Sequence, residues 1–175
     1  MRFLSDLGLF ALGLIAALFS VSIVRLAPAP WGMVQLPIIV LSLMVFFAPE
    51  RHLAAFALGL GIGLDAMSAY PFFVWTAIVA AAALCGWWIS RTVLTNRSLP
   101  SLILLGAAMR LAYFIFELAF SRAAELFGGS VWYLMSAIQV ESVLAAFGIE
   151  LATLAIVFII YARLRGERSR MLTHV

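Results

Sequence analysis

Residues 138–165 read IQVESVLAAFGIELATLAIVFIIYARLR, an apolar run that holds two glutamates and ends in two arginines. A helix needs about 20 apolar residues to cross a hydrocarbon core about 30 Å thick. The run is long enough to do so, and arginine at its exit is typical of the cytoplasmic boundary of a membrane. The sequence therefore predicts a membrane-spanning helix over residues 138–161 and a basic cytoplasmic tail over 162–175.

The rest of the chain has the same character, since 66% of its residues are apolar and 11% are charged. A soluble globular domain has about 45–50% apolar and about 25% charged residues, so this composition excludes one. We expect a single all-α integral membrane domain, a polytopic bundle of about six transmembrane helices, the first of them a retained anchor. The expected spans are about 7–24, 31–48, 53–69, 71–90, 99–120 and 138–161. The fourth ends in Trp87 and Trp88, and paired indoles there are typical of the headgroup level.

The arginines predict which side of the membrane each loop faces. The chain has eleven basic residues, all of them arginine, and cytoplasmic loops are enriched in Lys and Arg. With six spans, two arginines (Arg25 and Arg122) fall on one side and one (Arg110) falls inside a span. The other eight fall on the opposite side: Arg2, Arg51, Arg91, Arg97, Arg163, Arg165, Arg168 and Arg170. Both termini are therefore predicted to be cytoplasmic.

Few residues have a pattern typical of a catalytic or metal-binding site. Cys85 has no partner cysteine, and His52 and His174 have no neighbour at metal-ligand spacing. We therefore expect no metal, no cofactor, no catalytic residue, no nucleic acid and no soluble substrate. An intramembrane enzyme is the least favoured alternative, and it would need Glu150 or Asp65 as a general acid or base.

Arg110 and Glu150 are charged residues near the middle of the fifth and sixth spans. An ionisable side chain at that depth costs about 2.5–3.5 kcal/mol on insertion scales and usually has a partner. Because consecutive helices pack antiparallel, the two residues are expected to form a buried charge pair. We favour a structural role for the pair; the alternative is that it lines a substrate or proton path.

Three further acidic residues, Asp65, Glu117 and Glu141, fall in the outer halves of their predicted helices. They predict an outer acidic rim, with Arg25 and Arg122 nearby on the same side. Such a rim would bind a cationic ligand or the basic segment of a partner protein. The spacing does not choose between these two.

Glycine is concentrated in the third span. Gly59 and Gly63 lie four residues apart, a spacing that lets two helix backbones approach closely. Small residues in the fourth span, namely Ala80–Ala83 and Gly86, strengthen this interpretation. We expect the glycine pair to serve packing inside the bundle rather than formation of a homodimer.

These features resemble those of a known family. The succession Leu36-Pro37, an apolar span, Ala48-Pro49-Glu50-Arg51, the segment GLGIGLD at 59–65, Pro71 and a basic exit at Arg91 is similar to that of the rod shape-determining protein MreD family. Length and span number fit as well. The resemblance is most specific over residues 36–91.

The resemblance implies a non-enzymatic scaffold of the bacterial cell-shape and elongation machinery in the cytoplasmic (inner) membrane. Its implied partners are an MreC-like bitopic protein, the glycosyltransferase RodA, a penicillin-binding transpeptidase and the MreB filament, which links it to peptidoglycan synthesis. The family's bundle is also similar to the substrate-binding subunits of energy-coupling-factor vitamin transporters. That similarity supplies the alternative function, with a cavity expected at Asp65, Glu117 and Glu141.

Overall fold

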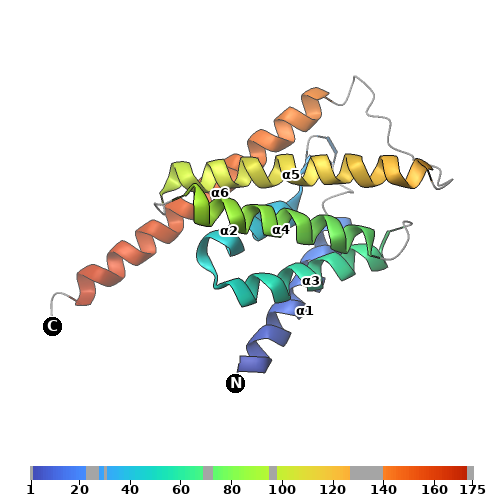
Figure 1. The fold of residues 1–175 in the computed structure, drawn as a ribbon. Coiled ribbons are helices and arrows are strands. Elements are labelled where there is room, and N and C mark those ends of the chain that lie inside the picture. Colours follow the sequence, from blue (N-terminus) through green and yellow to red (C-terminus); the bar gives the residue numbers. More distant parts are fainter. Residues whose placement is uncertain are drawn as a thin grey trace.

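The computed structural model describes residues 2–22, 28–29, 31–68, 73–94, 98–126 and 140–172. Within these ranges the chain forms helices and no β-strand (Figure 1). The elements are α1 (Arg2–Ser22), η2 (Trp31–Met33, a 3-10 turn), α2 (Leu36–Phe47), α3 (Glu50–Ala66), α4 (Val74–Thr92), α5 (Leu99–Leu126) and α6 (Val140–Leu172). The predicted all-α class is confirmed.

Among the described residues, four helices are long and apolar enough to cross a membrane, over Leu4–Ser22, Val74–Thr92, Leu99–Phe120 and Glu141–Leu164. They correspond to the first, fourth, fifth and sixth predicted spans. Large apolar side chains are exposed on all four, among them Ile15, Leu84, Leu111 and Ile156. Extended apolar surfaces of this kind are rare on soluble monomers and suit contact with lipid.

The second predicted span, 31–48, is wrong in length. The helix α2 covers only Leu36–Phe47, which is 12 residues and about 18 Å at 1.5 Å per residue. It begins late because Trp31–Met33 forms a separate 3-10 turn and Pro37 occupies the first helical turn. Proline has no N–H to donate and suits the first turn of a helix better than its interior. It follows that α2 reaches through little more than half of a hydrocarbon core.

The third span is displaced towards the N-terminus relative to the predicted 53–69. The helix α3 covers Glu50–Ala66, which is 17 residues and about 25 Å. It starts early because Pro49, in an extended conformation, precedes the first turn, where the carboxylate of Glu50 suits the positive end of the helix dipole. Residues expected in a loop, including His52, therefore belong to α3.

The bundle is arranged around α2. In turn, α1 packs against α3, α3 against α4, α4 against α5 and α5 against α6, while α2 contacts all five. Figure 1 shows α5, α4 and α3 one above another, with α6 crossing α5 obliquely. Side chains at the centre are fully buried, as at Leu41, Phe56, Leu60 and Leu105. The short helix is thus enclosed by the longer ones.

Contacts at the helix ends define two ends of the bundle. The imidazole Nε2 of His52 lies 3.6 Å from a carboxylate oxygen of Asp6, which places the start of α1 beside the start of α3. The rings of Phe47 and Tyr161 lie 4.4 Å apart, which adds the end of α2 and the C-terminal half of α6. We call this the Glu50 end and the other the opposite end. An even number of membrane crossings predicts that the start of α1 and the C-terminal half of α6 lie at the same end of the bundle. Which side of the membrane the Glu50 end faces stays a prediction.

Glycines make the contact between α1 and α3 possible. A Cβ atom added at Gly59 would overlap the carbonyl oxygen of Phe10, and one at Gly63 would lie 2.7 Å from the Cβ of Ala17. From the other side, a Cβ at Gly13 would lie 2.5 Å from a backbone oxygen of α3. The predicted close approach is therefore internal to the bundle, and its partner helix is α1.

Two further glycines, Gly61 of α3 and Gly86 of α4, serve other contacts. A Cβ added at Gly61 would lie 2.6 Å from the Cα of Thr76, so Gly61 is where α3 and α4 approach closely. A Cβ at Gly86 would lie 2.6 Å from the sulfur of Met109. Gly86 thus faces α5, and the expectation that it supports the Gly59 and Gly63 contact is wrong.

Candidate functional site

The charges in the middle of α5 and α6 meet. The guanidinium Nε of Arg110 lies 3.5 Å from the carboxylate Oε2 of Glu150, and the two side chains are 15% and 3% exposed. The sequence predicted this pair from the depth of the two residues in antiparallel helices. A carboxylate so enclosed needs compensating partners, because an unpaired buried charge is far more costly than a paired one.

The second oxygen of Glu150 serves the backbone. Its Oε1 accepts a hydrogen bond from the backbone N–H of Gln35, over 2.7 Å. Gln35 immediately precedes α2, and the first N–H groups of a helix have no partner within it. Gln35 is half-buried, and the carboxylate of Glu150 gives its N–H an acceptor inside the bundle. Glu150 therefore holds α5, α6 and the start of α2 together, and this geometry supports a structural role for the pair.

Asp65, near the end of α3, likewise accepts hydrogen bonds from backbone N–H groups, here at the start of α4. One carboxylate oxygen accepts the backbone N–H of Trp75 over 2.8 Å, and the other accepts the backbone N–H and hydroxyl of Thr76 over 3.0 and 2.6 Å. The residue before α4, Phe73, has a left-handed backbone (φ 76°) and no side-chain oxygen to cap the helix. Asp65 thus supplies from α3 the cap that α4 lacks.

This role corrects the predicted outer acidic rim. Asp65 is only 7% exposed, and both of its oxygens are engaged by α4. Glu117 is half-buried and engaged in an interaction, one turn beyond Tyr113, whose ring stacks on Trp75 at 6.1 Å. Glu141 is exposed in the first turn of α6. All three lie towards the opposite end, but Asp65 does not open onto a surface. Arg25 and Arg122 lie outside the residues whose side chains are described.

Asp65→Ala is expected to lower the thermal stability of the detergent-purified protein. It leaves two backbone N–H groups of α4 without an acceptor, and each such buried group costs about 1–3 kcal/mol. Asp65→Asn keeps an acceptor oxygen and should cost less. Glu141→Ala removes an exposed carboxylate and serves as the control, expected within about 0.5 kcal/mol of the parent. A melting temperature of Asp65→Ala equal to that of the control would contradict the capping role.

In the part of the chain that the structure describes, no group of three or more His, Cys, Asp and Glu side chains is arranged to hold a metal ion. Cys85 is half-buried in α4 as a free thiol. The arrangement of Arg110, Glu150 and Asp65 is thus one of charges that connect helices. Comparisons with family models, with curated proteins and with solved structures gave no match to this chain.

Proposed function

We propose that this protein is a non-enzymatic membrane scaffold of the bacterial cell-shape and elongation machinery, as its resemblance to the MreD family implies. In this role it binds an MreC-like bitopic protein and links it to RodA, a penicillin-binding transpeptidase and the MreB filament in the cytoplasmic membrane. The observation that carries the proposal is the use of the buried charges. Arg110, Glu150 and Asp65 are engaged in holding helices together.

The exposed surface suits such a role. Leu111, Ile115 and Leu118 of α5 are 51–60% exposed and lie at i, i+4 and i+7, which places them on one helical face. Ile156, Ile159 and others extend exposed apolar surface along α6. In a membrane, association of helices depends on van der Waals packing and hydrogen bonds between them and not on a hydrophobic driving force. A single-span partner helix would dock on a face of this kind.

The alternative, a substrate-binding subunit of an energy-coupling-factor vitamin transporter, needs a ligand cavity at Asp65, Glu117 and Glu141. Asp65 is engaged by α4 through both carboxylate oxygens. This observation favours the scaffold. A thermal shift on addition of a vitamin would support the transporter instead.

Site-specific photocrosslinking in the native cell tests the proposal. A photoreactive residue would replace, one at a time, Ile15 on α1, Ile115 on α5 and Ile156 on α6, all more than half exposed. The fully buried Leu105 is the control position, where no intermolecular crosslink is expected. The scaffold predicts crosslinks from at least one exposed face to a bitopic protein or to wall-synthesis enzymes. Crosslinks to an ATPase module, with none to wall-synthesis proteins, would contradict it.

A further inference from the structure

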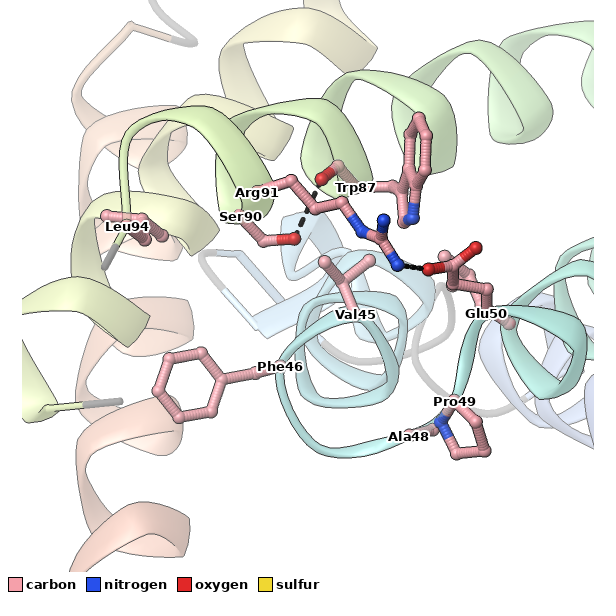
Figure 2. A pocket seen from close by; sticks show the side chains of 10 residues that line it. Val45, Phe46, Ala48, Pro49, Glu50, Trp87, Ser90, Arg91 and Leu94 are labelled. Atoms are coloured by element: carbon pink, nitrogen blue, oxygen red, sulfur yellow. Dashed lines mark hydrogen bonds and ion pairs between the residues drawn. The ribbon is translucent and has the colours of Figure 1, made fainter. Parts of the chain in front are cut away.

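A pocket opens at the Glu50 end, where α2 ends, α3 begins and α4 ends (Figure 2). Its volume is about 470 Å³, within the range of about 300–1,000 Å³ that is usual for small-molecule sites. Val45, Phe46 and Leu53 give it apolar walls, and Trp87 and Arg91 contribute polar atoms. A pocket of this composition can hold a ligand that is charged at one end and apolar at the other.

The indole N–H of Trp87 is the first indication of what the ligand carries. The nitrogen is buried and has no hydrogen-bond partner among the described residues. An indole N–H can only donate, and leaving such a buried donor unsatisfied costs about 1–3 kcal/mol. The guanidinium carbon of Arg91 lies 5.2 Å from the centre of the same ring. A neutral donor and a cation next to each other suit an oxyanion such as a phosphate.

The carboxylate of Glu50 is the second indication of what the ligand carries. Glu50 forms an ion pair with Arg91, and Figure 2 shows this pair at one side of the pocket. The two side chains are 52% and 61% exposed. An exposed ion pair is worth only about 0–1 kcal/mol, so it can open to admit a ligand. Among the described residues, the charged side chains that line the pocket are one anion and one cation, which suits a zwitterion and disfavours a purely anionic group.

The place of the pocket along α4 identifies the source of such a ligand. Trp87 and Arg91 lie in the last turns of the apolar helix Val74–Thr92, within about 8 Å of its end. Tryptophan and arginine at the end of a membrane helix are typical of the headgroup level. We propose that the pocket binds a phospholipid with a primary ammonium in its headgroup, whose phosphate accepts from Trp87 and Arg91 and whose ammonium donates to Glu50.

Native mass spectrometry of the delipidated full-length protein tests this assignment, with lipid added back at increasing concentration. The probes are phosphatidylethanolamine, phosphatidylglycerol and soluble phosphoethanolamine. The parent protein is expected to bind phosphatidylethanolamine at least fivefold more tightly than phosphatidylglycerol. Trp87→Phe should weaken binding of phosphatidylethanolamine about tenfold, the effect of losing one hydrogen bond to a charged group. The control is Trp88→Phe, the same change at the exposed neighbouring indole, which should leave binding unchanged.

Glu50→Gln gives a readout that does not depend on the amount of folded protein, because the two lipids compete within one sample. The variant removes the negative charge that attracts the ammonium and repels anionic lipid, so the preference for phosphatidylethanolamine should be lost. An unchanged preference in Glu50→Gln would overturn the proposal, as would parent-like binding by Trp87→Phe. Equal affinity for soluble phosphoethanolamine and for the lipid would also overturn it, in favour of a soluble metabolite.

Discussion

Gly59→Leu is expected to reduce accumulation of the folded protein severely. A Cβ atom at this position would overlap the carbonyl oxygen of Phe10 in α1, and backbone cannot rotate away as a side chain can. Overpacking in a close-packed interior costs about 1–3 kcal/mol and occasionally more, and a clash with backbone belongs at or above the top of that range. Fluorescence-detected size-exclusion chromatography of a tagged protein in mild detergent measures the outcome, with a loss of about tenfold in the monodisperse peak expected.

Gly8→Leu is the matched control, because a Cβ at Gly8, also in α1, would have no atom within 4 Å. It should elute and accumulate like the parent. Gly13→Leu disrupts the same contact from the side of α1, because a Cβ there would lie 2.5 Å from the backbone oxygen of Phe56. This variant should behave like Gly59→Leu. A monodisperse, parent-like peak for Gly59→Leu would show that α1 and α3 do not approach as described.

Arg110→Leu is expected to destabilise the bundle by about 3–5 kcal/mol, because it leaves a buried carboxylate without its cation. Glu150 is 3% exposed, so water cannot replace the guanidinium. Measuring the fraction of protein that survives a heating series in detergent gives the effect as a fall in melting temperature. A second change at Glu150 should restore much of the loss, since removing both charges removes the penalty.

The residue that replaces Glu150 in the double variant separates the effects of its two partners, Arg110 and the backbone N–H of Gln35. Glutamine is neutral and keeps an oxygen that can accept the N–H of Gln35, whereas leucine leaves that N–H unsatisfied at a cost of about 1–3 kcal/mol. Arg110→Leu with Glu150→Gln should therefore recover more than Arg110→Leu with Glu150→Leu. If neither double variant is more stable than Arg110→Leu alone, the pairing described here is wrong.

The sequence predicted the features that depend on composition and on depth along a helix. Arg110 and Glu150 lie at similar depths in consecutive apolar runs, and charges at such depths need partners. The spacing of Gly59 and Gly63 predicted a close helix contact. It did not identify α1 as the partner, because a glycine pattern describes only its own helix.

Features that depend on backbone conformation were missed. Residues 31–35 are mostly apolar, so a hydropathy window counts them as part of the span. The helix itself starts only at Leu36, with Pro37 in its first turn. Once α2 starts late, the N–H of Gln35 needs an acceptor, which explains the position of Glu150. Asp65 was assigned to a rim because it is a charge near a helix end. Its role as a cap depends on how α4 returns beside α3, which sequence spacing alone does not fix.

Trp87 and Trp88 show how similar residues take different roles. From the sequence, both indoles are predicted to lie at the headgroup level. In the structure Trp88 is 60% exposed, whereas Trp87 lines the pocket with its N–H buried. Neighbours in a helix point in directions about 100° apart, so only the packing of α4 against the rest of the bundle separates them.

We predict that the Glu50 end of the bundle faces the cytoplasm, because eight of the eleven arginines are expected on that side. Labelling of single cysteines with a membrane-impermeant maleimide tests this most directly, in a Cys85→Ala background that removes the chain's one cysteine. Thr92→Cys, exposed at the Glu50 end, and Glu141→Cys, exposed at the opposite end, are compared in intact and in permeabilised cells. With the Glu50 end in the cytoplasm, Glu141→Cys is expected to react in intact cells and Thr92→Cys only after permeabilisation. Reaction of Thr92→Cys in intact cells, or of both from one side, would contradict it.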